Sequence, residues 1–209
     1  MLSKVAINIE IIVKDNKFLE IKNYYEIIND TVTFKNEDLN AGETKKYLVN
    51  INLNRNKPKI ILEVKYVSMV DGYNRGCNSF EYLKFSDDKP TVNIQVDKEK
   101  NRVVASLMLK EARRLADEDK IDEGKTVIND TIKYLQESYS KDEKFTRDLI
   151  SDLETNLENL NEYEGKGKYE IASFNTQLDT QRCVSDKSKT GGIYSTSFTK
   201  GMEKLFKDN

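Results

Sequence analysis

The first residues of the chain alternate between apolar and polar side chains. Val5, Ile7, Ile9, Ile11 and Val13 form an apolar row, and the residues between them are mostly polar. A period of two places one row against a core and leaves the other in water, which is typical of a half-buried β-strand. We therefore predict a strand over residues 5–13.

The same period returns further along the first half of the chain. It is clear in residues 47–53, 60–66 and 92–96, and weaker in residues 19–25, 31–34 and 80–85. Turn-forming stretches separate these segments, among them Asn29–Asp30, Asn40–Gly42 and Asp71–Gly72. About seven short strands of this kind predict an antiparallel β-sandwich over residues 1–97. The alternation argues against a parallel sheet buried on both faces.

The hydrophobic period changes to three or four residues after Asp97. Asp97 is suited to cap a helix N-terminus, and Glu99 complements the helix dipole there. The apolar stripe of the first predicted helix consists of Val104, Leu107, Met108, Leu115 and Ala116, and that of the second consists of Val127, Ile128, Ile132 and Leu135. Because only the short polar turn Asp119–Lys120 separates them, we expect an antiparallel helix pair.

A third helix is predicted from a Ser-x-x-Glu capping box, Ser140 and Glu143. Its apolar face is Phe145, Leu149, Leu153, Leu157 and Leu160. Glycines at 165 and 167 end it, residues 169–183 form a fourth helix, and Met202, Leu205 and Phe206 suit one closing amphipathic turn. The predicted fold is therefore α+β: the sandwich over 1–97, an antiparallel bundle of three to four helices over 98–183, and an irregular tail over 184–209.

Composition agrees with two small cores and narrows the range of partners. Of the 209 residues, 37% are hydrophobic and 33% are charged, a lean supply of apolar residues. Lys and Arg total 34 against 36 Asp and Glu, a net charge of -2. This balance gives no electrostatic drive toward phosphate backbones or anionic lipid, so we expect neither nucleic acid nor direct membrane insertion.

The chain has no apolar run of the roughly 20 residues that a membrane span needs and no apolar signal core. We expect an intracellular, cytoplasmic protein, although the chain could also be a piece of a longer one. Cys77 and Cys183 fall in different predicted domains, and the chain contains no His. We therefore expect no disulfide framework, no zinc site and no His-dependent hydrolytic triad.

Other candidate sites have weaker structural contexts. The carboxylate pairs Glu37–Asp38 and Asp87–Asp88 are interpreted as solvated turn charges. The stretch Asp186–Thr190 matches Asp-x-Ser-x-Thr, the first loop of a metal-ion adhesion site, but too few residues come after it to supply the other ligands. Gly191–Gly192 lacks the preceding strand and following helix of a phosphate-binding loop. We assign no catalytic, cofactor-binding or metal-binding residue.

Aromatic and basic residues occur together between residues 73 and 85. They are Tyr73, Arg75, Phe80, Tyr82, Lys84 and Phe85. Such a mixture can stack single-stranded bases. With a negative overall charge, the packing of a sheet against its own rings is the favoured interpretation.

Several short motifs resemble one known family. Residues 38–44, Asp-Leu-Asn-Ala-Gly-Glu-Thr, and residues 62–66, Leu-Glu-Val-Lys-Tyr, are similar to the β-sandwich placed after the A domain in intracellular proteins of the von Willebrand factor type A family. The helical stretches 102–116 and 132–135, and the tail residues 181–182, 192–196 and Met202, resemble the helices and chain end of these proteins. The resemblance implies an accessory region whose A domain lies in the same or another chain.

The A domain itself, which holds the metal site of that family, is absent from these residues. No ligand set can therefore be carried over, and no Cys/His pattern suits the ubiquitin-ligase modules of some relatives. The preferred hypothesis is a non-enzymatic module that binds a protein partner or acts as a scaffold. Candidate contact positions are Ile12, Tyr24, Tyr25 and Tyr82, with packing within a strand as the commoner interpretation of each.

Three alternatives remain open. The chain could be a structural subunit of a large assembly, using an unpaired edge strand and a polar tail. It could be the non-catalytic part of a ubiquitin-ligase-like protein of the same family. It could also be an enzyme that depends on a carboxylate or Tyr in a deep pocket.

Overall fold

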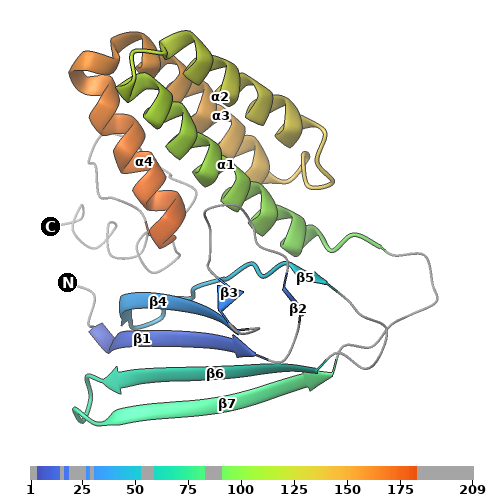
Figure 1. Cartoon of the computed structure of the whole chain (residues 1–209), viewed down its shortest axis with the longest axis vertical. Coiled ribbons are helices and arrows are strands. Elements are labelled where there is room, and N and C mark those ends of the chain that lie inside the picture. Colours follow the sequence, from blue (N-terminus) through green and yellow to red (C-terminus); the bar gives the residue numbers. More distant parts are fainter. Residues whose placement is uncertain are drawn as a thin grey trace, which may run out of the picture. The chain divides into compact units, whose positions relative to one another are not determined.

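A computed structural model describes residues 4–14, 17–18, 27–28, 31–52, 59–82 and 91–182. The chain divides into two compact units, Met1–Thr91 and Val92–Asn209. The described part of the first contains strands and the described part of the second contains helices (Figure 1). The predicted α+β class is confirmed. The predicted tail over 184–209 lies outside the described residues.

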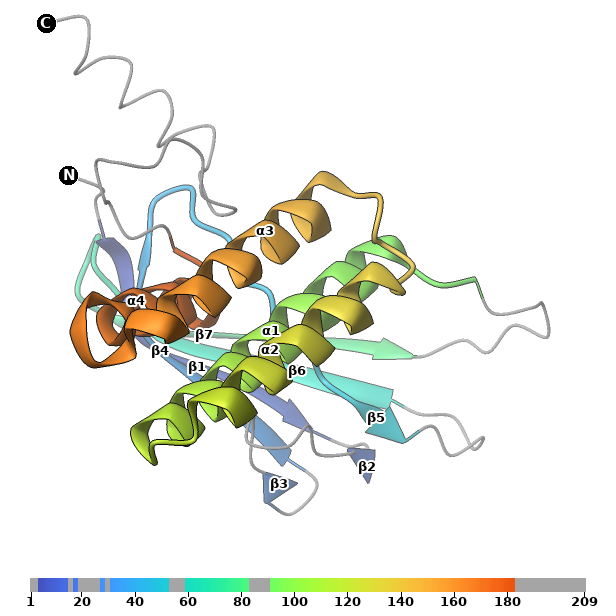
Figure 2. The same cartoon turned by 90° about the horizontal axis from the view of Figure 1, so that it is seen from above.

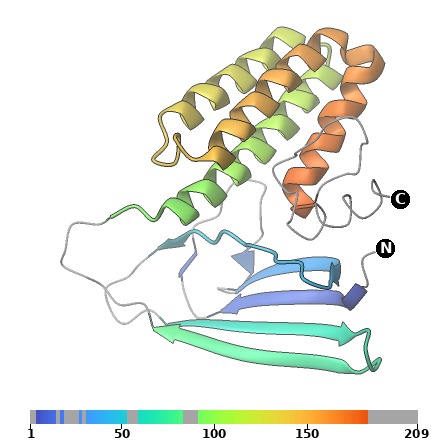
Figure 3. The ribbon, with the colours of Figure 1, turned by 180° about the vertical axis from the view of Figure 1, so that it is seen from behind.

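An antiparallel sheet forms the first unit, with strand order β3-β4-β1-β6-β7. The strands are β1 (Lys4–Lys14), β3 (Ile27–Ile28), β4 (Thr31–Asn40), β6 (Lys59–Ser68) and β7 (Asn74–Tyr82). Figure 3 shows the long strands β1, β4, β6 and β7 running side by side. Two short strands, β2 (Lys17–Phe18) and β5 (Ile51–Asn52), pair with each other separately.

The core of the sheet lies on one face, around Val13, Val32 and Phe34. Tyr47 and Val49 pack against this cluster. They belong to residues 43–50, which have no strand pairing, so the strand predicted over 47–53 is reduced to β5. In the described residues, the second layer of the predicted sandwich is therefore this segment and the β2–β5 pair rather than a full sheet.

The strand predicted over residues 92–96 is wrong, because helix α1 (Ile94–Asp117) begins there. Asn93 is the N-cap: its side-chain oxygen accepts hydrogen bonds from the N–H groups of Gln95 at 2.9 Å and Val96 at 3.3 Å. Asp97, predicted as the cap, lies inside the first turn. Three alternating apolar residues are too few to distinguish a strand from the start of a helix.

The helices of the second unit lie beside one another (Figure 2). They share one apolar core. After α1 come α2 (Ile121–Gln136), α3 (Lys144–Asn159), the short η1 (Leu160–Glu162) and η2 (Tyr163–Gly167), and α4 (Lys168–Thr180). The turn expected at Asp119–Lys120 and the apolar faces expected for α2 and α3 are present. The finer expectation of an antiparallel bundle of three to four helices stays a prediction.

The buried face of α1 differs from the predicted stripe. Leu115 and Ala116 are buried, but Val104, Leu107 and Met108 are only half-buried. The buried face also contains polar residues: Asn101, Arg102 and Ser106. A search for apolar residues misses a helix face whose polar members are paired inside the protein.

Ser140 links α1 to the start of α3, in a different way from the predicted capping box. Glu143 is the N-cap residue of α3, without a side-chain cap bond. The buried Ser140 hydroxyl contacts the side chains of Asn101 at 2.9 Å and Thr146 at 3.0 Å, and its N–H donates to the carboxylate of Asp97 at 2.8 Å. Ser140 of the predicted cap therefore connects α1 to α3.

A second polar connection ties α1 to α4. The Arg102 side chain is 1% exposed, and it donates to the backbone oxygen of Leu178 at 2.7 Å and to the Glu99 carboxylate at 2.9 Å. A buried guanidinium needs such partners, because an uncompensated buried charge is strongly destabilising.

The break predicted at the two glycines is present, since Gly165 has non-helical backbone angles between α3 and α4. Gly167, at the start of α4, is buried. A Cβ atom there would lie 1.9 Å from the backbone oxygen of Asn159. The chain reversal therefore depends on glycine at this position.

We expect Gly167→Ala to lower the free energy of unfolding by about 2–3 kcal/mol, because the added methyl group overpacks a backbone contact. In an exposed helix interior, a Gly→Ala substitution would instead raise the free energy of unfolding by up to about 1 kcal/mol. Urea denaturation followed by circular dichroism measures the effect. Glu164→Ala, an exposed change in the same turn, is the control, and a Gly167→Ala protein at least as stable as the parent would contradict the expectation.

Candidate functional site

The turn between β6 and β7 exposes three large apolar side chains within five residues. Met69, Val70 and Tyr73 are 49%, 85% and 68% exposed. Single exposed apolar residues are ordinary, but a contiguous group is a common feature of interaction surfaces. We call Met69, Val70 and Tyr73 the hairpin tip.

Hydrogen bonds fix the conformation of this turn. The N–H of Ser68 donates to the oxygen of Tyr73 at 2.9 Å, and the N–H of Gly72 donates to the oxygen of Ser68 at 2.8 Å. The Asp71 carboxylate accepts from the N–H of Tyr73 at 3.2 Å and pairs with Arg75. Gly72 has a φ of 77°, which glycine adopts without strain.

The charge of Asp71 is favoured by the same contacts. The hydrogen bond from Arg75, then those from the Tyr73 N–H and the Ser68 side chain, lower the pKa of Asp71 below its ordinary value. The tip is thus presented by a turn whose polar groups are paired.

A β-bulge shapes the sheet beside the hairpin. The register between β1 and β6 shifts between Ile7 and Glu10, and Asn8 adopts a φ of 51°. Asn tolerates this left-handed conformation better than most residues. Ala6 and Ile9, three positions apart, are both buried, while Val5 and Ile7 are half-buried. The single buried row predicted from Val5 to Val13 is therefore wrong: the bulge interrupts it.

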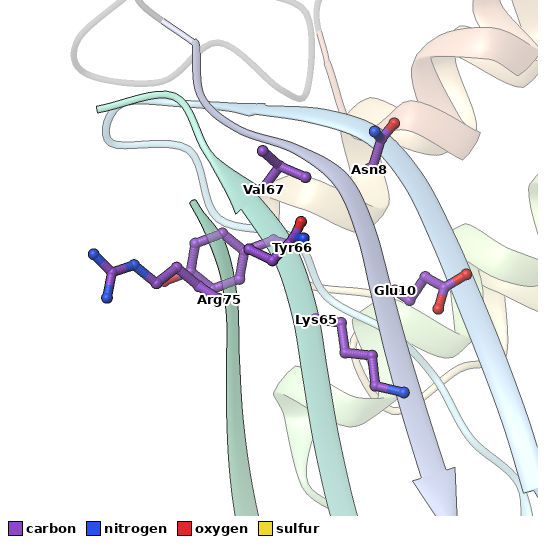
Figure 4. Close-up of a pocket in the computed structure, with 7 residues that line it drawn as sticks. Asn8, Glu10, Lys65, Tyr66, Val67 and Arg75 are labelled. Carbon is purple, nitrogen blue, oxygen red and sulfur yellow. The ribbon is translucent and has the colours of Figure 1, made fainter. Parts of the chain in front are cut away.

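A hollow of about 440 Å³ lies next to the bulge. Figure 4 shows its lining side chains. They are Asn8, Glu10, Lys65, Tyr66, Val67, Asn74 and Arg75. Val67 and Asn74 flank the turn that carries the hairpin tip. The hollow therefore adjoins the tip and adds polar groups to it.

Charged side chains of both signs cross the neighbouring strands. Glu10 lies 3.7 Å from Lys35, and Glu63 lies 2.6 Å from Lys14 and 3.2 Å from Lys65. Hydrogen bonds from Lys14 and then Lys65 lower the pKa of Glu63. This carboxylate is held ionised, which suits recognition of polar groups rather than proton donation.

Of the sequence-predicted contact positions, Ile12 is the one whose side chain falls within the described residues. Ile12 is half-buried in β1 and is paired with Thr33 and Glu63. Tyr24 and Tyr25 lie outside the described residues, as does the side chain of Tyr82. Of the aromatic and basic group, Tyr73 and Arg75 lie at the hairpin.

The carboxylate pair Glu37–Asp38 belongs to β4 rather than to a turn. Asp38 pairs with Lys4 at 2.7 Å. The pair Asp87–Asp88, the Asp186–Thr190 stretch and Gly191–Gly192 fall outside the described residues. Within the described ranges, no three Asp, Glu, Cys or His side chains gather in a way that could hold a metal ion.

Sequence reasoning missed the hairpin tip, although a signal was present. Met69 and Val70 stand directly before the turn pair Asp71–Gly72, where polar residues are usual. Apolar residues in a tight turn cannot reach the core of their own sheet.

The helices within the described ranges were also compared with the needs of a membrane span. None of them combines the length and the apolar character that crossing a membrane requires.

A separate polar cluster joins α1, η2 and α4 in the second unit. The Tyr163 hydroxyl donates to Asp117 at 2.9 Å, and Lys168 reaches the same carboxylate at 2.5 Å. Hydrogen bonds from Lys168 and then Tyr163 lower the pKa of Asp117. Burial, and then the bond to Asp117, raise the pKa of Tyr163 to about 12. These contacts stabilise the helical unit and leave no group of this cluster poised for proton transfer near neutral pH.

Comparison with known proteins gives no relative: no family model, curated protein or solved structure matches the chain.

We expect Asn8→Val to lower the stability of the sheet by about 1–2 kcal/mol, because a β-branched residue is strained at positive φ. Urea denaturation and hydrogen exchange of the β1 amides measure the loss. Asn8→Gly is the matched control and should be nearly neutral, since glycine adopts this conformation freely. Equal stability of the Val and Gly variants would contradict the role of the bulge.

Tyr163→Phe should lower the free energy of unfolding by about 1–2 kcal/mol at pH 7, through loss of a hydrogen bond to a carboxylate. The difference from the parent should shrink as the pH rises from about 10 to about 12. In that range the unfolded tyrosine loses its proton while the folded one keeps it, so the parent alone loses this stabilisation. Urea denaturation across the pH series measures it. Tyr139 is exposed, so Tyr139→Phe is the control and should leave the free energy of unfolding at pH 7 nearly unchanged.

Proposed function

We propose that this chain is a non-enzymatic protein-interaction module whose first unit contacts a protein partner through the hairpin tip. The observation that carries the proposal is the exposure of Met69, Val70 and Tyr73 on one hydrogen-bonded turn. As an accessory region resembling that of a von Willebrand factor type A protein, it would act in the cytoplasm beside an A domain in the same or another chain. This last part rests on the sequence motifs alone.

The free energy available from burying the hairpin tip supports its binding to a protein partner. Burial of apolar surface contributes about 25 cal/mol per Å², and a Val or Met side chain gains roughly 1.5–3 kcal/mol when fully buried. Val70 is 85% exposed and obtains little of this gain in the free chain, and Met69, which is 49% exposed, obtains about half of it. A partner surface that covers them would supply it.

The fixed conformation of the turn supports the same proposal. Ordering a flexible loop on binding costs free energy for each immobilised residue. Here Ser68, Asp71 and Gly72 already hold the backbone through hydrogen bonds within the turn. The apolar side chains are therefore presented at low entropic cost, which favours recognition by a complementary apolar recess.

The polar hollow would contribute specificity. Glu10, Lys65 and Arg75 line it and carry both signs of charge. Mixed charges beside an apolar contact select a partner with matching polar groups and disfavour a uniformly charged polymer. The net charge of -2 also supports a protein rather than nucleic acid.

Replacing Val70 by Asp should weaken binding of a tip-dependent partner at least about tenfold, because it places a charge in the apolar contact. Full-length parent and variant serve as baits in lysate, with quantitative mass spectrometry of the bound proteins. Tyr169→Asp, which alters a similarly exposed residue of α4, is the matched control.

The expected outcome is a set of proteins retained by the parent and the Tyr169→Asp bait and lost from the Val70→Asp bait. A bound set unaffected by Val70→Asp would rule out the tip as the contact. Circular dichroism of each bait checks that the fold is kept.

A further inference from the structure

Strand β7 has one side that no described residue covers. In the described part of the chain it pairs only with β6. The residues from Asn74 to Ser79 are all exposed. An edge with free N–H and C=O groups is a template for another strand.

Two hydrogen bonds establish which backbone groups of β7 point outward. The N–H of Ser68 points to β7, since it donates to Tyr73 at 2.9 Å, and the N–H of Met69 points to β1, since it donates to Val5 at 3.0 Å. In an antiparallel sheet, successive residues of a strand direct their N–H and C=O groups alternately to one side of the strand and to the other. With the register Tyr66↔Arg75 and Val64↔Cys77, the odd-numbered residues of β7 bond to β6.

The even-numbered residues of β7 therefore direct their N–H and C=O groups away from the sheet. Gly76, Asn78 and Phe80 are the central ones. A second strand can pair with β7 only in a register that brings outward groups against outward groups.

The sequence of β7 is complementary to itself when read antiparallel about Asn78. In that register Arg75 of one copy lies opposite Glu81 of the other, and the symmetry produces this pair of opposite charges twice. Gly76 lies opposite Phe80 in this register. Asn78 faces its own copy.

Neighbouring registers lose this match. Centring the pair on Cys77 puts Arg75 opposite Ser79, and centring it on Ser79 puts Glu81 opposite Cys77. In both, the charges of the strand lose their opposite partners. Centres at Cys77, Asn78 and Ser79 all bring outward groups against outward groups, so it is charge that selects the position about Asn78.

We propose that β7 pairs antiparallel with β7 of a second copy of this chain, centred on Asn78, so that the two sheets become continuous. The partner is identified by the two-fold charge complementarity of the strand. This inference goes beyond the proposed function and is independent of it, since it uses the backbone edge of β7 and not the hairpin tip.

The central backbone contact is tested with Asn78→Pro and Asn78→Ala in the full chain. Proline removes an N–H that points outward, so pairing with β6 is kept while the central bonds between copies are lost. Sedimentation equilibrium under reducing conditions, which exclude disulfides through exposed Cys77, should show a dimer. Proline should raise its dissociation constant at least about a hundredfold, through two lost hydrogen bonds, and alanine less than about tenfold.

The register is tested by charge reversal. Arg75→Glu and Glu81→Arg each place like charges opposite one another twice, and each should raise the dissociation constant about tenfold or more. The double variant restores opposite charges and should return to within about threefold of the parent. The double variant lacks the Arg75–Asp71 ion pair, just as Arg75→Glu does. Recovery of dimerisation in the double variant therefore cannot result from a repaired turn.

A parent chain that stays monomeric across the concentration range would overturn the inference. So would dimers that tolerate Asn78→Pro with circular dichroism unchanged, or a double charge reversal weaker than both single ones. None of these results bears on the binding of a partner by the hairpin tip, which Val70→Asp tests.

Discussion

The first unit depends on the pairing of β1 with both of its neighbours. β1 bonds to β4 on one side and to β6 on the other, so its register sets the positions of all the long strands. The bulge at Asn8 changes that register on the β6 side alone. Because β7 pairs only with β6 among the described strands, this bulge also determines where the hairpin and its tip lie relative to β1.

In the second unit, the comparable constraint is a set of buried polar contacts on α1. Asp97, Asn101 and Ser140 connect the first turns of α1 to the start of α3, and Arg102 connects α1 to α4. Apolar burial is non-directional, whereas these bonds require particular partners. They fix which face of α1 meets its neighbours, and this explains why the buried face does not follow the apolar residues alone.

The same contacts show how far the sequence could predict the structure. Long periodic segments such as α2 and α3 are predictable because their apolar faces carry the pattern without interruption. The start of α1 is not, since Val92, Ile94 and Val96 suit a strand equally well and only the cap at Asn93 decides. The bulge in β1 is also hidden, because an Asn at positive φ leaves no mark on the hydrophobic pattern. The hairpin tip could have been found from Met69 and Val70 before an Asp-Gly turn, but its exposure needed the structure.

The β6–β7 hairpin carries two surfaces of different chemistry. The tip offers apolar side chains and can select a partner by shape, whereas the edge of β7 offers backbone groups that any strand can meet unless side chains specify the register. Arg75 and Glu81 supply that specification. Since the tip residues precede Asn74, pairing centred on Asn78 would leave both tips uncovered.

Antiparallel pairing would also point the two tips in opposite directions. From Asn74 of one copy to Asn74 of the other, about eight residues along the strand direction correspond to about 27 Å at roughly 3.4 Å per residue. The tips lie beyond Asn74 at each end, so they are further apart than this. A partner with two recesses that match both tips would bind the pair more tightly than either copy alone, because the second contact becomes intramolecular. Self-pairing through the edge would thus convert a single contact at the tip into a bivalent one.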